Sequence, residues 1–366
     1  MRLFKPTYAP VIFLLLCAIV VGGCEKKFDL SSLPSATSVN NIGDTSYVEK
    51  GSWTGFKKPR AILYGQDQLF YIADTYNNRV VMLNQAGQEL SSSIAILHPI
   101  SIAQDNRLDL LVGAETIEAT THDTIGVVLR MRLVAAKHDL RAAHIDTIWR
   151  EPARPKRRYV GIAVAPSDEY LIARDGPDNT SPVDPDSRVL RFQYKQIRVD
   201  SSVDRFITPL SELQAGAGSS ITSVNHPTGI ATFPKSADFI LTQQSDGVQY
   251  SAIWMVFSRT SDFEGWLPKY DPSIVTGIDF VSPNRFKEAL GVCVDRTLKD
   301  VYIVDASQDS VVKFNSRGRF KAESFGIKTS GISLNRPSSV AVAEGTLYIC
   351  DTENNRIVLY RLSTDF

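Results

Sequence analysis

The chain has 366 residues, and its 40 Lys and Arg side chains balance its 40 Asp and Glu side chains. A chain without net charge lacks the basic surface that dominates nucleic-acid binding, so we expect no nucleic-acid partner. The length is enough for one large domain or two small ones.

The first predicted element is a secretory signal. Arg2 and Lys5 precede an apolar run, and the small residues of VGGC follow, ending at Cys24. The run is shorter than the roughly 20 residues that a membrane-spanning helix needs. The VGGC ending resembles a bacterial lipobox, which implies cleavage before Cys24 and acylation of its thiol. The alternative is an ordinary secretory signal with a chance cysteine.

The resulting division of the chain is a lipoprotein signal peptide over residues 1–23, a tether over 24–44 and a folded body over 45–366. The tether is polar and rich in Ser and Asn, which is typical of a flexible linker. We expect lipid on Cys24 to hold the protein at the bacterial cell envelope, at its outer membrane, with the body outside the cytoplasm.

Two distant segments of the body are nearly the same. Tyr71–Leu83 reads YIADTYNNRVVML, Tyr348–Tyr360 reads YICDTENNRIVLY, and Asp300–Phe320 carries a related stretch. Each has an apolar strand that ends in Asp, a short polar turn and a second apolar strand. Short strands at regular intervals, without a long amphipathic helix, indicate an all-β repeat architecture.

Weaker copies fill the middle of the chain and bring the number of units to six. Their second strands are expected near Tyr71, Leu110, Tyr170, Phe239, Tyr302 and Tyr348, at spacings of 39 to 69 residues. The basic unit is therefore about 40 residues long, and the middle copies carry insertions.

These segments resemble the NHL-repeat family of β-propellers, closely in the first unit and the last two and weakly in the middle three. The resemblance implies an all-β, six-bladed β-propeller of four-stranded blades around a central channel. The last unit ends after its third strand, while Thr45–Trp53 precedes the first unit. We therefore expect this N-terminal strand to close the ring and to remove its exposed edges.

The repeated turn has a structural interpretation. We expect the Asp at the strand end to accept hydrogen bonds from backbone N–H groups of the turn. An Asn in the turn suits left-handed backbone angles, and the Arg that opens the next strand can bridge to a carboxylate or carbonyl. The residues concerned are Asp74, Asn77 (or its neighbour), Arg79, Asp305, Asp351, Asn354 and Arg356. We assign them no catalytic role.

The insertions of units two to four are expected in the connections between second and third strands. These are Glu115–Gly126, Asp175–Ser187 and Gln244–Tyr250, and the linkers Ser211–Asn225 and Thr276–Glu288 are expected to open on the same face. Long loops on a rigid scaffold are where function concentrates. The alternative is drift in loops that nothing constrains.

Two patterns raise the question of a metal. The third-unit insertion holds Asp175, Asp178, Asp184 and Asp186, and calcium prefers such oxygen ligands; the alternative is a solvated acidic loop. Zinc is the second candidate, because His98-Pro99 and His226-Pro227 begin units two and four.

Some propellers with NHL repeats hold zinc through channel histidines, and lactonase-like propellers hold calcium in the channel. A zinc site normally needs three protein ligands, and no third histidine matches. Calcium and zinc therefore stay open, and no cofactor is assigned.

One basic stretch, REPARPKRRY, includes Arg157 and Arg158 and could meet an anionic lipid or glycan. Tyr250, with Trp254 and Trp266 nearby in the sequence, could stack on a sugar or a peptide. The alternatives are a solvated turn and ordinary packing between blades.

These patterns favour a binding or scaffolding module rather than an enzyme. The expected partner is a protein, a peptide or a glycan, held on the face over blades two to four. The alternative is a metal-dependent propeller enzyme, a lyase or a lactonase-like hydrolase, with its site at the channel mouth. We expect Cys293 and Cys350 to be unpaired thiols in apolar strands.

Overall fold

The computed structural model describes residues 46–194, 205–216, 219–244, 247–326 and 333–364. All of them belong to one compact unit, Ser46–Phe366. The predicted signal peptide (1–23), Cys24 and the tether (24–44) lie outside the described residues. Within the described ranges, no helix is long and apolar enough to cross a membrane.

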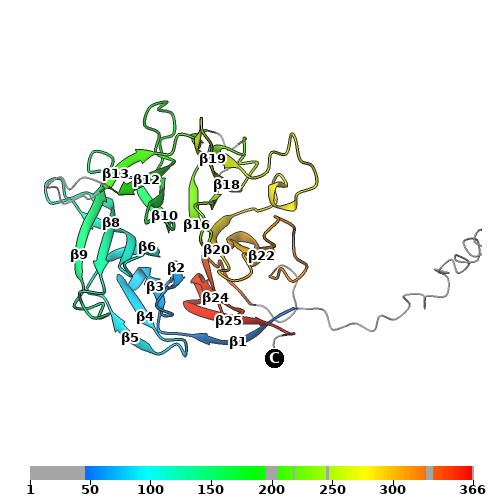
Figure 1. The fold of residues 1–366 in the computed structure, drawn as a ribbon. Coiled ribbons are helices and arrows are strands. Elements are labelled where there is room, and N and C mark those ends of the chain that lie inside the picture. Colours follow the sequence, from blue (N-terminus) through cyan, green and yellow to red (C-terminus); the bar gives the residue numbers. More distant parts are fainter. Residues whose placement is uncertain (1–45, 195–204, 217–218, 245–246, 327–332, 365–366) are drawn as a thin grey trace, which may run out of the picture. The chain divides into compact units, whose positions relative to one another are not determined.

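Antiparallel sheets follow one another around a central channel, and each is a blade of the ring (Figure 1). In each blade the first strand lies at the channel and the later strands lie further out. Blade 1 contains β2 Ala61–Tyr64, β3 Phe70–Asp74, β4 Arg79–Leu83 and β5 Glu89–Ser92. Blade 2 contains β6 Leu97–Gln104, β7 Leu110–Ile117, β8 Thr124–Arg132 and β9 His144–Arg150. Blade 3 contains β10 Arg158–Val164, β11 Tyr170–Asp175, β12 Arg188–Tyr194 and β13 Arg205–Pro209.

The second half of the chain continues the ring. Blade 4 contains β16 Pro227–Thr232, β17 Phe239–Gln243, β18 Ala252–Arg259 and β19 Glu264–Pro268. Blade 5 contains β20 Ala289–Val294, β21 Val301–Asp305 and β22 Ser310–Phe314. Blade 6 contains β23 Ser339–Ala343, β24 Thr346–Asp351, β25 Arg356–Leu362 and β1 Tyr47–Trp53. The six predicted second strands are β3, β7, β11, β17, β21 and β24, which confirms the predicted six-bladed propeller.

The N-terminal strand closes the ring, as predicted. β1 pairs antiparallel with β25, from Tyr47 opposite Leu362 to Trp53 opposite Ile357. Figure 1 shows this blue strand beside the red end of the chain. The side chain of Tyr47 is buried, and its hydroxyl lies 3.2 Å from that of Tyr302 in the neighbouring blade. The first described strand therefore supplies the outer edge of the last blade.

Blade 5 departs from the expected four strands. Among the residues described in this blade, its sheet has three strands, and isolated bridges from Val311 to Phe325 and from Phe314 to Phe320 take the place of the fourth. A short parallel pair, β14 Gln214–Ala215 and β15 Ser223–Val224, lies in the linker between blades 3 and 4.

Small residues on the first strands allow neighbouring blades to approach closely. One level of the ring is formed by Ala61, Ser101, Gly161, Gly229, Gly291 and Ser339. A Cβ added to Gly229 would lie 2.7 Å from the Leu290 carbonyl oxygen, and one added to Gly291 would lie 2.5 Å from that of Ser338. The blades thus meet backbone to backbone beside the channel, where a larger side chain would push them apart.

The two late cysteines are unpaired, as predicted. Cys350 is buried on β24, and Cys293 lies on β20 with part of its surface open to the channel. Each occupies a position of the repeat where other blades carry Ala, Gly, Thr, Val or Leu.

Candidate functional site

The repeated turn is anchored by a buried carboxylate. Asp74, at the end of β3, is fully buried and accepts hydrogen bonds from the Lys57 backbone N–H at 2.7 Å, Asn77 Nδ2 at 2.8 Å and Arg79 Nε at 2.9 Å. Its charge is thus balanced by a guanidinium, and its oxygens are shared among three donors. The turn itself is one short 3₁₀ turn, η2 Thr75–Asn77.

The last blade repeats this arrangement. Asp351 accepts from the Asn335 backbone N–H at 2.7 Å, from Asn354 Nδ2 at 2.9 Å and from Arg356 Nε at 2.7 Å. In blade 5, Asp305 accepts from the backbone N–H groups of Lys287 and Glu288, at 2.8 and 3.0 Å.

The backbone donors differ from the expectation. They lie in the segment that leads into the first strand of the same blade, and not in the turn after the second strand. The reason is geometric, because the end of the second strand lies beside the start of the antiparallel first strand. The Asp therefore fixes where each blade begins.

Blades 1, 5 and 6 each have a short 3₁₀ turn after the second strand, here called a lean turn. A second hydrogen bond joins each lean turn to the next blade. The left-handed residue that ends the turn accepts, through its side chain, from the backbone N–H that precedes the proline of the next blade. The pairs are Asn78 with His98 (3.0 Å), Asp309 with Arg336 (2.7 Å) and Asn355 with Lys58 (2.8 Å). Asn78 and Asn355 have φ values of 54° and 55°, so the left-handed residue follows Asn77 and Asn354 in the two turns.

The two histidines thus occupy the position before the proline that precedes or begins the first strand of a blade. Lys58 and Arg336 occupy this position in blades 1 and 6. His98 and His226 share their positive φ and the proline that follows. His98 Nδ1 lies 2.7 Å from Glu115, and His226 Nδ1 lies 2.9 Å from Asp175. Each therefore pairs with a different carboxylate. Among the described residues, no three His, Cys, Asp or Glu side chains come together in a way that could hold a metal ion.

The insertion of blade 3 is held by a buried guanidinium. Arg157 is 2% exposed and contacts Glu151 at 2.6 Å, Asp184 at 2.8 Å and Asp186 at 2.7 Å. The sequence had suggested an exposed basic residue on a binding face. Arg157 instead is buried and ties the C-terminal end of the loop, at Asp184 and Asp186, to the linker before β10.

A second buried guanidinium completes this cluster. Arg174, near the end of β11, contacts Glu151 at 2.8 Å and Asp184 at 3.0 Å, and it donates to the carbonyl oxygens of Pro185 and Asp186. Partial burial alone would raise the pKa of Asp184, but hydrogen bonds from Arg157 and Arg174 outweigh it and hold that pKa below its usual 3.8.

The carboxylates that suggested calcium are therefore directed to other partners. Asp184 and Asp186 bind guanidinium groups, and Asp175 lies against His226. Asp178 accepts from the Thr180 backbone N–H and hydroxyl, at 3.1 and 2.7 Å. These contacts are those of an internally hydrogen-bonded loop.

The remaining face residues also have partners within the protein. Arg158 contacts Glu115 at 2.6 Å, so it is not a free cation. Trp254 and Trp266, which had suggested a stacking surface near Tyr250, are buried between and within the blades. Tyr250 is half-buried.

The face on which the second-to-third strand connections open, here named the loop face, is asymmetric as expected. Blades 1, 5 and 6 carry single 3₁₀ turns: η2, η4 Ala306–Gln308 and η5 Thr352–Asn354. Blades 2 to 4 carry the long hairpin and loops. Near their tips, Ile117 has 55% of its surface exposed to solvent and Val183 has 80%.

One of the linkers expected on this face lies there only in part. In Thr276–Glu288, Phe280 and Val281 of η3 Asp279–Val281 are buried among aromatic side chains between blades 4 and 5. This part of the linker is core.

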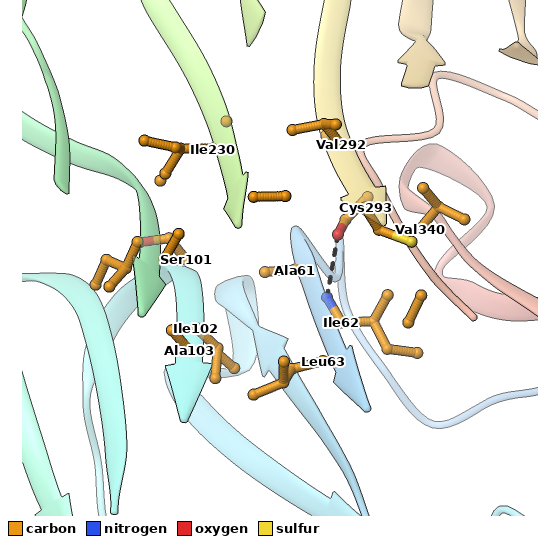
Figure 2. A pocket seen from close by; sticks show the side chains of 18 of the residues that line it. Ala61, Ile62, Leu63, Ser101, Ile102, Ala103, Ile230, Val292, Cys293 and Val340 are labelled. Carbon is orange, nitrogen blue, oxygen red and sulfur yellow. Dashed lines mark hydrogen bonds between the residues drawn. The ribbon is translucent and has the colours of Figure 1, made fainter. Parts of the chain in front are cut away.

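A cavity of about 820 Å³ occupies the channel between the six first strands. Figure 2 shows Ala61, Ile62 and Leu63 of β2 facing the strands that carry Ile230 and Cys293, and the hydrogen bond from the Ile62 backbone N–H to the Ser339 hydroxyl at 3.3 Å. The cavity has the size of a small-molecule site. Two residues that line its ends, Arg60 and Arg296, were not singled out from the sequence, because no motif surrounds either of them.

The sequence of blade 6 identifies the type of repeat in that blade. The family model of the NHL repeat matches residues 334–360, which cover the strands β23 and β24 and most of β25. The last blade is an NHL repeat. No curated protein matches the chain at a significant level.

Solved structures share the propeller fold of this chain at low sequence identity. An auxiliary nutrient binding protein from Bacteroides ovatus has a TM-score of 0.59 and 11% identity, over 87% of this chain and 77% of that one. An aldose sugar dehydrogenase from Streptomyces coelicolor has 0.54 and 13%, over 87% and 98%. A gluconolactonase from Xanthomonas campestris has 0.52 and 16%, over 87% and 90%. At such identities the likeness establishes the fold alone.

Proposed function

We propose that this NHL-repeat propeller is a lipid-anchored, extracytoplasmic binding module that holds a protein or peptide partner on its loop face over blades 2 to 4. The observation that carries the proposal is the locked insertion of blade 3. Arg157 and Arg174 fix a long loop from within, and its tip presents Val183 with 80% of its surface exposed. A loop that is rigid before binding loses little entropy when a partner docks.

The chemistry of the loop tips favours a polypeptide over a glycan. Ile117 and Val183 are aliphatic, whereas sugar recognition relies on exposed aromatic faces, and Trp254 and Trp266 are buried. Exposed apolar side chains at the tips of neighbouring loops, surrounded by polar residues, are typical of protein interaction surfaces. Two of the basic residues that suggested an anionic partner, Arg157 and Arg158, are also neutralised by ion pairs.

The lipid anchor is the second part of the proposal. Acylation of Cys24 would hold the body at a membrane, and the tether over 24–44 would let the loop face reach a partner. The support is the VGGC sequence at the end of an apolar run. Metabolic labelling with a palmitate analogue tests this part, since a Cys24→Ser variant should take up no label.

The binding surface is tested by site-specific photo-crosslinking in cells. A benzophenone amino acid replaces Val183 in one variant and Leu298 in a control variant. Leu298 is also exposed, at 63%, but it lies in a first-to-second strand turn on the opposite face. We expect one discrete protein adduct from position 183 and none from position 298. Equal adducts from both positions, or none from position 183, would contradict the proposal.

A further inference from the structure

The two ends of the channel carry different charged residues: both signs are present at the loop-face end, which Arg60 and Arg336 also line, and cations alone at the other end. The acidic residues that line it are Asp175, Glu288 and Glu353, and all three lie at the loop-face end. Each of them is paired, with His226, Arg336 and Lys58 respectively. At the opposite end, where the first-to-second strand turns lie, the charged lining residues are Lys235 and Arg296, and both are cationic.

Arg296 reaches across this second end. It follows β20 of blade 5, yet its guanidinium donates to the carbonyl oxygens of Gly65 at 3.1 Å and Tyr64 at 2.9 Å, at the end of β2 in blade 1. Blades 5 and 1 are not neighbours, because blade 6 lies between them. The side chain therefore spans a part of the channel and places a positive charge in its opening.

Neither cation has a carboxylate partner among the described residues. A guanidinium has five N–H donors, and the two carbonyl bonds leave three of them for another acceptor. The nearby turn carboxylates have other partners. Asp67 accepts from the Tyr71 hydroxyl and Gln104 Nε2, Asp105 contacts Arg130, and Asp295 accepts from the Thr297 and Leu298 backbone. This end of the channel thus has two positive charges and unused hydrogen-bond donors.

The rest of the channel restricts the part of a ligand that is attached to its anionic group. Its middle is formed by one Ile or Val on each first strand, followed by Leu63, Cys293 or Ala in the next position. A volume of about 820 Å³ accommodates a small molecule.

We propose that the Arg296 end of the channel binds the carboxylate of a small organic acid, with Arg296 and Lys235 as its cationic contacts. The body of the acid lies along the apolar middle of the channel. This site is separate from the protein-binding loop face and does not depend on it.

The test is a set of ligand titrations on the full chain in detergent, followed by NMR, with benzoate and citrate as carboxylate probes. Benzamide is the neutral match for benzoate, and inorganic phosphate tests for binding of any free anion. We expect at least one carboxylate to bind with a Kd of about 1 mM or tighter, and benzamide at least tenfold more weakly. Tighter binding of phosphate than of either carboxylate would overturn the organic-acid assignment.

Three variants locate the site. Arg296→Gln and Lys235→Gln should each weaken carboxylate binding at least tenfold. Arg60→Gln is the matched control, because Arg60 also lacks an ion pair among the described residues but lines the other end of the channel. It should leave the affinity within twofold of the parent chain.

Three results would overturn the proposal. The first is the lack of any carboxylate binding tighter than about 10 mM. The second is an equal loss of affinity in Arg60→Gln and Arg296→Gln. The third is an Arg296→Gln chain with a lower melting temperature but unchanged affinity, which would make Arg296 a strap between blades and nothing more. Lys235 lies on an exposed turn, so its variant keeps the test decisive if Arg296→Gln fails to fold.

Discussion

Arg174 stands in blade 3 where Asp74 stands in blade 1. Each is buried in the last cross-strand pair between the second and third strands of its blade, Arg174 opposite Arg188 and Asp74 opposite Arg79. The charge at this position is therefore reversed, and Arg174 contacts the carboxylates Glu151 and Asp184, although the cross-strand residue is an arginine in both blades. In blade 4 the position is Gln243, which accepts from the Asn225 backbone N–H and donates to the Tyr250 carbonyl. In blades 1, 3 and 4 the side chain at this position therefore anchors the segments at the loop face. Its residue type differs between the short turn of blade 1 and the longer loops of blades 3 and 4.

The substitution Arg174→Asp tests whether the ion-pair cluster holds the blade 3 loop. It places in blade 3 the residue type that blades 1, 5 and 6 carry at this position. The new carboxylate would be buried beside Glu151 and Asp184, which would both lose the guanidinium of Arg174. We expect the free energy of unfolding to fall by about 3 kcal/mol or more, as when one partner of a buried ion pair is lost. Urea unfolding measures this, with Arg361→Asp, at an exposed site, as the control. A loss below about 1 kcal/mol would mean that the cluster does not hold the loop.

Asp74→Ala should destabilise blade 1 by about 3 kcal/mol, because it leaves the Lys57 backbone N–H and the Arg79 guanidinium without their acceptor. The double-mutant cycle with Arg79→Ala isolates the charge pair. We expect the double variant to be more stable than the sum of the single losses predicts, by about 1.5 kcal/mol or more. Simple additivity in urea unfolding would show that Asp74 acts through the Lys57 backbone N–H and Asn77, and not through Arg79.

Ring closure depends on the inward side chains of β1. Tyr47→Ala should cost about 3 kcal/mol or more, since it empties a buried aromatic site between β25 and blade 5. Val48, the next residue along the strand, is 40% exposed, and Val48→Ala should change stability by less than about 0.5 kcal/mol. Equal effects of the two substitutions on the urea midpoint would show that β1 does not pack as described.

Acid should loosen the blade 3 loop. The pKa of Asp184 is held below 3.8 by Arg157 and Arg174, whereas in the unfolded chain it has its ordinary value. A depressed carboxyl pKa stabilises the folded state fully above the unfolded pKa, and this stabilisation is lost as the pH falls through the folded pKa. We therefore expect protection of the loop amides from hydrogen exchange to fall below about pH 4. An Asp184→Asn chain should show weaker protection at neutral pH and a smaller pH dependence; an unchanged pH profile would exclude Asp184 as the cause.

The channel thiol should be inert. Burial, with the nearby Asp295 carboxylate, raises the pKa of Cys293 to about 12. At pH 8 only about one thiol in 10⁴ is then ionised, and the thiolate is the reactive form. We expect N-ethylmaleimide to modify Cys293 in the folded chain at least 100-fold more slowly than in the urea-unfolded chain. Peptide mass spectrometry measures both rates. Comparable rates would mean that the fold neither shields the thiol nor raises its pKa.

The fold could be predicted from the sequence because its signals are local. In blades 1 and 6 the Asp, Asn and Arg of the turn lie within five residues of one another, and the strand pattern recurs at spacings of 39 to 69 residues. The missing fourth strand of blade 5 left no such signal, since Phe320 and Phe325 look like ordinary strand residues and differ only in how they pair.

The candidate site was predicted in outline but not in its contacts. The loop face and its insertions followed from spacing alone. The basic stretch around Arg157 read as a solvated turn, because its partners Asp184 and Asp186 are 27 and 29 residues away. Arg296 meets blade 1 more than 200 residues away in the chain. Such long-range ion pairs and contacts across the channel leave no pattern in a single sequence.

The most direct measurement of the central claim is the affinity of the protein partner that cross-links at position 183. Calorimetry would compare the parent chain with Val183→Asp and with Leu298→Asp, which places the same charge on the opposite face. The account predicts at least tenfold weaker binding for Val183→Asp, because a carboxylate would be desolvated at the centre of the contact, and less than a twofold change for Leu298→Asp. Equal affinities of all three chains would contradict the claim that the loop face is the binding surface.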